Sequence, residues 1–153
     1  QRAIGHAYAG KGDVSPVAAW QLAARHPTLR IVFAHWGGGL PFYELMPEVR
    51  AALRNTFYDS AATTYLYDFK IFPTAADLCG ADRILFGTDY PLLRQGPFLE
   101  RVRALGLPKV ALEAMLGGNA ARLAPPLPPA ASATLSAEQI LGRDRNVGES
   151  QRG

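Results

Sequence analysis

The chain has 153 residues, of which 48% are hydrophobic and 19% are charged, so it can form an ordinary globular domain with a core. Its formal net charge of +3 comes from scattered arginines, which argues against a nucleic-acid partner. No apolar run approaches the roughly 18 residues of a membrane span. For that reason we expect no membrane partner. Cys79 is the single cysteine and cannot form an internal disulfide, so we expect a cytoplasmic protein.

The predicted elements alternate between helices and apolar strands. The first part of the chain is expected to form a glycine-rich loop at 1–14, a helix from the cap Ser15 and Pro16 to His26, and a strand at 30–34. In the middle part we expect a helix that opens at Pro41 with a kink or late start at Pro47, a strand at 56–59, a loop at 61–67, and a helix at 68–78 interrupted near Pro73. The last part is expected to form a strand at 83–87, helices at 97–105 and 108–115, and a short helix at 120–123 capped by Asn119.

This alternation predicts an α/β fold. Strands that are apolar on both faces and are joined by helices form parallel sheets with right-handed crossovers. We therefore expect strands 30–34, 56–59 and 83–87 to be parallel neighbours in sequential order. A small flavodoxin-like domain is a weaker alternative, because it predicts a phosphate-binding loop that the sequence lacks. Residues 1–124 form the predicted domain, and the Pro- and Ala-rich segment 125–153 is expected to be disordered.

Polar, titratable side chains follow the first and last of these strands. His35 comes after strand 30–34 and precedes three glycines, and Asp89 follows strand 83–87. The carboxyl ends of parallel strands share one edge of a sheet, where α/β proteins build their sites. His35 is either a general acid/base or metal ligand, or a histidine bonded to a backbone carbonyl. Asp89 is either a metal ligand or general base, or the cap of a turn.

Other candidates lie in the loops beside these strand ends. Asp59 ends the middle strand and is a candidate supporting group. Four aromatic residues either line a pocket or cover the rim of the core: Trp36, Tyr65, Tyr67 and Tyr90. Trp36, Tyr65 and Tyr90 are the candidates to bind substrate.

Four segments carry a family resemblance in their order and spacing: IVFAHWGGGLPFYELMPEV, FYDSAA, ADRILFGTDYP and GGNAARL. Together they resemble the C-terminal half of the amidohydrolase-related metal-dependent hydrolases, which include the aminocarboxymuconate-semialdehyde decarboxylase-like and resorcylate decarboxylase-like enzymes. The resemblance covers residues 1–124. It implies the C-terminal part of a (β/α)8 TIM barrel, with the segments at 56–60 and 84–88 as the seventh and eighth strands.

The resemblance also implies roles. His35 would be a catalytic residue beside the metal, and Asp89 would be a metal ligand and possible base. The paired histidines of the family, His-x-His after the first strand, are absent, because the chain has only His6, His26 and His35. The chain is therefore expected to be an incomplete part of the enzyme. We expect a divalent metal, zinc by preference, whose remaining ligands lie upstream of residue 1.

The expected activity is that of a metal-dependent hydrolase acting on a small molecule. The enzyme would activate water on the metal to attack an amide, ester or lactone carbon. Two alternatives stay open: non-oxidative decarboxylation of an aromatic or unsaturated acid at the same site, and an inactive half-barrel or interaction module. We expect the 153-residue chain alone to be inactive, and a homodimer is a candidate assembly of the intact enzyme.

Overall fold

The computed structural model describes residues 14–124, and residues 1–13 and 125–153 lie outside this range. The predicted loop at 1–14, apart from its last residue, and the predicted tail therefore fall outside the described residues. The elements are α1 (Pro16–Arg25), β1 (Ile31–Phe33), η1 (His35–Gly38), η2 (Leu40–Leu45), α2 (Pro47–Ala52), β2 (Thr56–Asp59), α3 (Thr63–Leu66), α4 (Ile71–Cys79), η3 (Ala81–Arg83), β3 (Ile84–Leu85), α5 (Gln95–Arg103), α6 (Lys109–Glu113), η4 (Ala114–Gly118) and α7 (Asn119–Leu123).

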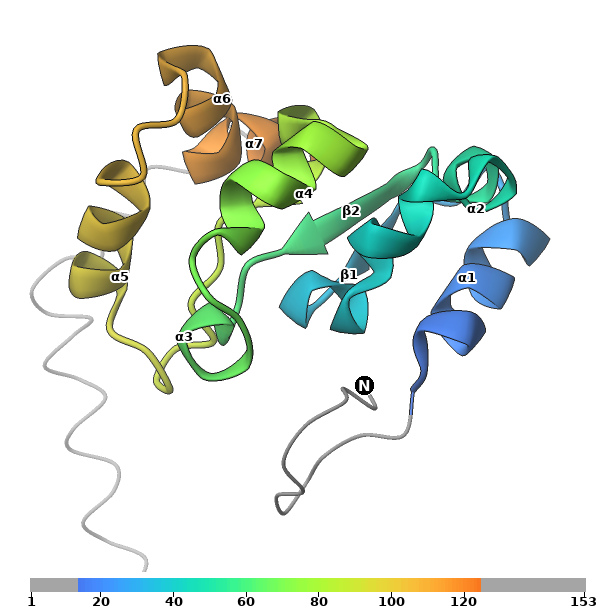
Figure 1. Ribbon diagram of the computed structural model, residues 1–153, viewed down its shortest axis with the longest axis horizontal. Coiled ribbons are helices and arrows are strands. Elements are labelled where there is room, and N and C mark those ends of the chain that lie inside the picture. The colour runs from blue at the N-terminus through green and yellow to red at the C-terminus, as the bar shows by residue number, and fades with distance from the viewer. Residues whose placement is uncertain (1–13, 125–153) are drawn as a thin grey trace, which may run out of the picture. The chain divides into compact units, whose positions relative to one another are not determined.

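The three strands form a parallel sheet in the order β1-β2-β3, which confirms the predicted topology (Figure 1). In this register Ile31 lies opposite Thr56, and Tyr58 lies opposite Ile84. The strands are shorter than the apolar runs suggested, since β3 contains two residues and β1 three. Parallel neighbours in sequential order require a helical crossover between each pair, as in an α/β barrel.

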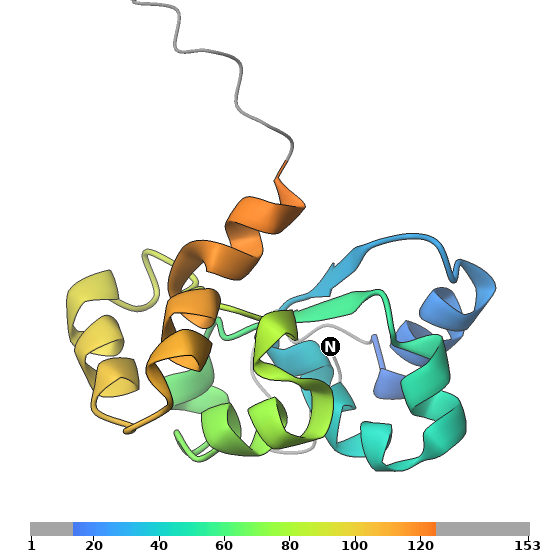
Figure 2. The same ribbon diagram turned by 90° about the horizontal axis from the view of Figure 1, so that it is seen from above.

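The two faces of the sheet have different surroundings. Thr56, Tyr58 and Ile84 point to one face and are buried, whereas Val32 on the other face is 49% exposed. Figure 2 shows η2, α2 and α4 together on one side of β1 and β2. The helices that connect the strands therefore cover one face of the sheet. Among the described residues the opposite face is only partly covered, since its Phe57 is half-buried.

Aromatic side chains form the centre of the core. The Phe72 ring lies 5.8 Å from that of Phe69 and 6.2 Å from that of Phe98, and Phe86 lies 5.5 Å from Phe98. These four rings come from α4, α5 and the segments beside them. Burying a side chain of this size contributes about 1.5–3 kcal/mol. The cluster therefore holds α4 and α5 against the sheet.

Proline and serine set the helix boundaries largely as predicted. Ser15 caps α1, because its Oγ accepts a hydrogen bond from the Ala18 N–H at 3.2 Å, and the helix ends at Arg25 with His26 as its C-cap. Pro47 starts α2, which is the predicted late start. The interruption predicted at Pro73 is wrong. Pro73 lies in the first turn of α4, where its missing N–H would have no helical partner in any case.

Two further sequence-based expectations are also wrong. The predicted loop at 61–67 contains the helical turn α3. Asn119 was expected to cap a helix, but its side-chain amide is buried and donates to the carbonyls of Ala81 at 2.8 Å and Ile84 at 2.7 Å. It thereby satisfies backbone acceptors next to β3. The helical geometry breaks at Gly117, where φ is 173° and ψ is −29°, between the helix that starts at Lys109 and α7.

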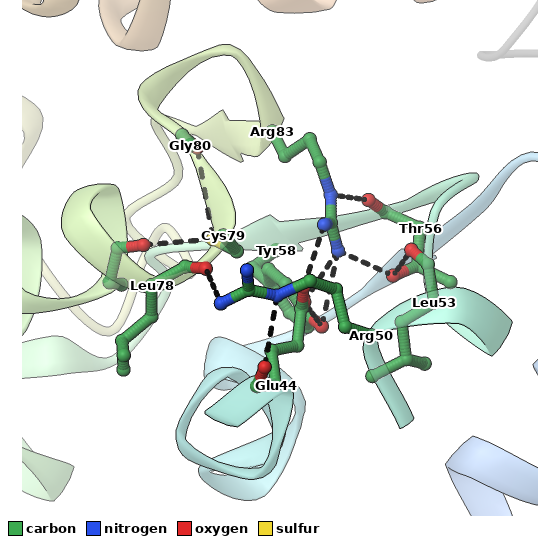
Figure 3. A network of polar contacts seen from close by, with 10 residues as sticks. Glu44, Arg50, Leu53, Thr56, Tyr58, Leu78, Cys79, Gly80 and Arg83 are labelled. Atoms are coloured by element: carbon green, nitrogen blue, oxygen red, sulfur yellow. Dashed lines mark hydrogen bonds and ion pairs between the residues drawn. The ribbon is translucent and has the colours of Figure 1, made fainter. Parts of the chain in front are cut away.

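A buried polar network joins η2 to the amino ends of β2 and β3 (Figure 3). The Arg83 guanidinium donates to both oxygens of Glu44, at 2.8 and 2.6 Å, and its Nε donates to the Thr56 carbonyl at 2.8 Å. The Tyr58 hydroxyl donates to Glu44 Oε1 at 2.6 Å. Burial and then the Glu44 carboxylate raise the pKa of Tyr58, which keeps this hydroxyl protonated as a donor. The charges of Arg83 and Glu44 are therefore paired with each other within the fold.

This network leads to a stability prediction. Arg83→Met would leave the Glu44 carboxylate, whose side chain is 0% exposed, without its cation. We expect a loss of about 3–5 kcal/mol in the free energy of unfolding, measured by chemical denaturation. The control is Lys109→Met, which removes an exposed ion pair with Glu113 and should cost about 0.5 kcal/mol or less. Equal losses in the two variants would contradict a structural role for Arg83.

A second prediction concerns the single thiol. Burial raises the pKa of Cys79 to about 12, and its Sγ–H donates to the Ala75 carbonyl at 3.0 Å. At pH 8 we expect Ellman's reagent to label the thiol only after unfolding in urea, because the native thiol is neutral and covered. Between pH 9 and 12 the unfolded chain releases the thiol proton before the native chain does, so the free energy of unfolding should fall as pH rises. Rapid labelling of the native protein would show that the α4 end opens easily.

Candidate active site

His35 and Asp89 meet at the carboxyl-terminal edge of the sheet. His35 follows β1 and Asp89 follows β3, and the distance from His35 Nε2 to Asp89 Oδ2 is 3.3 Å. The sequence predicted a common edge but not direct contact, since β2 lies between the two strands. The side chains are 35% and 46% exposed, so a small molecule can reach both. The structure therefore brings the two predicted catalytic residues together as an accessible imidazole–carboxylate pair.

The backbone of this edge is strained. Within residues 14–124, the non-glycine residues with positive φ are His35, Trp36, Ala62 and Asp89, at 55°, 56°, 55° and 60°. All four lie in the loops that follow the three strands. A left-handed conformation costs roughly 1–2 kcal/mol for an ordinary residue, and such residues gather at functional sites when their surroundings hold them. The strain therefore supports the assignment of this edge as the site.

The three glycines after Trp36 continue the left-handed turn. Gly37, Gly38 and Gly39 have φ values of 58°, 67° and 93°. A Cβ on Gly37 would also lie 2.9 Å from the Cβ of Leu40, so glycine is required there for internal packing. The structure shows that Gly37 lets the chain turn tightly over the core.

The three predicted substrate-binding aromatics have different positions. Tyr65 and Tyr90 are 65% and 73% exposed. Trp36 is fully buried, and its indole N–H donates to Thr63 Oγ1 at 2.9 Å. The ring of Trp36 also packs edge-on against Phe72 at 5.0 Å. The two tyrosines thus present surface to a ligand, whereas Trp36 lies beneath the site, and substrate contact by any of the three stays a prediction.

Asp59 at the end of β2 supports the neighbouring loops. Its Oδ1 accepts a hydrogen bond from the Ala61 N–H at 2.6 Å. Its Oδ2 lies so close to Gly87 that a Cβ there would be 2.7 Å away. The carboxylate therefore fixes the start of the β2–α3 loop and packs over the backbone of the β3 loop.

Sequence reasoning missed two buried hydroxyl groups in this region, those of Ser60 and Thr63. Ser60 Oγ donates to the Gly87 carbonyl and accepts from the Gly87 N–H, both at 3.1 Å. The signal in the sequence was the run of small hydroxyl and alanine residues directly after a strand. It was interpreted only as the composition of a loop.

The metal-binding capacity of the described residues is partial. Carboxylate and imidazole groups such as Asp89 and His35 are donor types that divalent metals take in proteins. Within residues 14–124, no group of three His, Cys, Asp or Glu side chains could hold a metal ion. A catalytic zinc normally takes three protein ligands, so the pair matches a divalent metal in chemistry and supplies part of a complete ligand set.

Comparison with known proteins assigns the family. The family model described as Amidohydrolase matches residues 13–124. The chain belongs to the amidohydrolase family. A search of curated protein sequences finds no match. None of the helices in the part of the chain that the structure describes is long and apolar enough to cross a membrane.

Solved structures place the amidohydrolase chain among TIM-barrel proteins. A TIM-barrel protein from Bordetella bronchiseptica is 28% identical with a TM-score of 0.58, and the match covers 71% of this chain and 38% of that protein. A dihydroxybenzoic acid decarboxylase from Polaromonas sp. JS666, with bound manganese and the inhibitor 2-nitroresorcinol, is 20% identical with a TM-score of 0.58, covering 71% and 39%. An amidohydrolase from Burkholderia multivorans with bound zinc is 23% identical with a TM-score of 0.51, covering 70% and 48%.

These matches confirm the predicted fold class, a partial α/β barrel of the amidohydrolase type. The chain spans less than half the length of each of these relatives. The predicted division of the chain at residue 124 stays a prediction, because residues 125–153 lie outside the described part.

Proposed function

We propose that the protein carrying this chain is a metal-dependent hydrolase of the amidohydrolase superfamily. The observation that carries the proposal is the 3.3 Å contact between His35 Nε2 and Asp89 Oδ2 at the carboxyl-terminal edge of the sheet. Active sites of TIM-barrel enzymes lie at this edge, and the chain belongs to a family of such enzymes. The strained backbone at both residues supports the same assignment.

Asp89 is the proposed metal ligand, and zinc is the proposed metal. A bound divalent ion would polarise a substrate carbonyl and lower the pKa of a water molecule to about 7. His35 provides the proton transfer. When its Nε2–H donates to the Asp89 carboxylate, Nδ1 is free to accept a proton from water and to return it to the leaving group. The carboxylate holds the ring in that tautomer.

The proposed substrate is a small molecule with an amide, ester or lactone group. Tyr65 and Tyr90 are candidates to contact it, because both phenol rings are exposed in loops at this edge. We propose that Trp36 acts through the backbone of its neighbour His35, since its ring is buried. Assembly as a homodimer stays a prediction.

A second candidate is non-oxidative decarboxylation of an aromatic or unsaturated acid. The observation in its favour is the similarity to the Polaromonas dihydroxybenzoic acid decarboxylase. At 20% sequence identity, this is a similarity of fold. The same His35–Asp89 pair can serve this chemistry, because the carbon that loses carbon dioxide must take up a proton. The two candidates differ in whether the proton ends on carbon or on a leaving heteroatom.

One experiment separates these candidates. The protein that carries this sequence would be loaded with zinc or manganese and tested on amides, esters, lactones and aromatic acids. Acid release without carbon dioxide supports the hydrolase, and release of labelled carbon dioxide from a ring carboxylate supports the decarboxylase. If neither occurs with any substrate class, the third alternative, an inactive or interaction module, is favoured over both.

The proposed role of Asp89 leads to a prediction. Asp89→Asn should keep the fold but lower metal content and reduce turnover by about 10²–10⁴-fold, because it removes the carboxylate charge at the site. Elemental analysis, circular dichroism and the assay above measure these effects. The matched control is Asp77→Asn, which makes the same change at an exposed position on α4 and should leave metal content and turnover unchanged. Unchanged turnover in Asp89→Asn would refute the ligand role.

A further inference from the structure

A single path of buried hydrogen bonds connects the three loops at the active edge of the sheet. We infer that Thr63, together with Ser60, is a positioning residue that holds His35 against Asp89. Neither hydroxyl touches the imidazole or the carboxylate of the pair. The inference rests on the proposed function in one respect, which is that the His35–Asp89 pair is the reacting site. The position of His35 relative to Asp89 can be tested without measuring turnover.

The first part of the path fixes the loop that carries His35. Trp36 is the next residue, its side chain is 0% exposed, and its indole N–H donates to Thr63 Oγ1 at 2.9 Å. Thr63 is also 0% exposed and belongs to α3, in the loop after β2. An indole N–H has no other bonding capacity than this one donor bond. Loss of the Thr63 oxygen would therefore leave a buried donor unpaired, at a cost that favours movement of Trp36.

The second part of the path fixes the loop that carries Asp89. The Thr63 hydroxyl donates its own hydrogen to the carbonyl of Ser60. The Ser60 hydroxyl in turn bonds both backbone groups of Gly87, each at 3.1 Å, two residues before Asp89. Thr63 thus accepts from the His35 loop and donates toward the Asp89 loop. The backbone and the side chain of Ser60 join these two sets of hydrogen bonds, so the link between the loops passes through Ser60 itself.

The strain in both loops explains why such a path is needed. His35 and Asp89 have φ values of 55° and 60°, which ordinary residues avoid. Strained residues persist only where the surrounding structure over-determines them. Within the described residues, the path supplies that constraint by tying both loops to the middle one. If it breaks, we expect the loops to relax and the distance between His35 Nε2 and Asp89 Oδ2 to increase.

A purely structural role for Thr63 makes a different prediction, and the chain contains a matched control. Thr56 is 1% exposed, its hydroxyl donates to the Leu53 carbonyl at 2.8 Å, and it accepts from Arg83 at 3.2 Å. It lies at the amino end of β2, the opposite end from the His35–Asp89 pair. Thr63→Val and Thr56→Val therefore delete the same buried group, one in α3 beyond the carboxyl end of β2 and one at its amino end.

The test compares Thr63→Val, Thr63→Ser and Thr56→Val in the protein that carries this sequence. We expect Thr63→Val to lower kcat by about 10–100-fold with KM changed less than about twofold, because a misplacement of about 1 Å at the chemistry has effects of this size. Thr63→Ser restores the hydroxyl and should recover most of kcat. Thr56→Val should lower the thermal midpoint while leaving kcat unchanged. Equal kcat losses in the two valine variants, or no recovery with serine, would overturn the inference.

A second measurement does not depend on activity. The nitrogen and proton chemical shifts of the His35 ring report its contact with Asp89, and Asp89→Asn provides the reference for a broken contact. In Thr63→Val the shifts should move toward those of the reference, and in Thr56→Val they should remain at the wild-type values. Unchanged His35 shifts in Thr63→Val would overturn the inference even in an active enzyme.

The design also separates failure of the inference from failure of the proposed function. If the protein turns over no substrate, the proposed function fails, but the ring shifts still decide whether Thr63 holds the pair. If Thr63→Val does not fold, Trp36→Phe replaces it, because this change removes the indole N–H and keeps an aromatic ring in the core. The same shift toward the Asp89→Asn reference is then expected, and its absence would overturn the inference.

Discussion

The rest of the fold depends on the buried pair of Arg83 and Glu44. The strand β3 has two residues, so its ladder alone provides few bonds to hold it in register. The Arg83 guanidinium adds five contacts: two to the Glu44 carboxylate, one to the Thr56 carbonyl of β2, and one each to the hydroxyls of Thr56 and Tyr58. Removal of these charges from water costs several kcal/mol per ion, and the two-oxygen geometry offsets that cost. The pair therefore fixes β3 against β2 and η2 at one defined position.

The two ends of β2 have different functions. At the amino end, Thr56 belongs to a network in which Arg83 and Glu44 pair with each other and are largely buried. At the carboxyl end, Ser60 links two loops whose backbone is strained and whose titratable residues, His35 and Asp89, remain accessible. A stable end without reactive groups can support a strained end with them, because both are parts of one short sheet. This is the division of function seen across parallel barrels.

The partly covered face of the sheet agrees with the assignment to the amidohydrolase family. Val32, Phe57 and Leu85 point to this face, and Val32 is 49% exposed. In a closed barrel, strand residues of this orientation fill the interior in layers. The chain spans 38–48% of the length of the barrel relatives described above, so three strands show only part of such an interior. The apolar character of these residues is what a barrel interior requires.

Sequence alone determined the local features of this protein. The apolar runs predicted three parallel strands in order, Ser15 and Pro16 predicted the start of α1, and the positions of His35 and Asp89 directly after strands predicted that both lie at one edge of the sheet. These local features follow from residues within a few positions of one another, which set strand burial and helix capping.

Tertiary structure decided how distant residues combine. Glu44 and Arg83 are 39 positions apart, and His35 and Asp89 are 54 apart. No local pattern specifies such pairs, because a buried polar group is stable with whichever partner the folded chain brings within bonding distance. For the same reason Asn119, expected as a helix cap, became a buried hydrogen-bond donor. Sequence alone also left open whether Trp36 lines a pocket or covers the core, and only the fold pairs its indole N–H with Thr63.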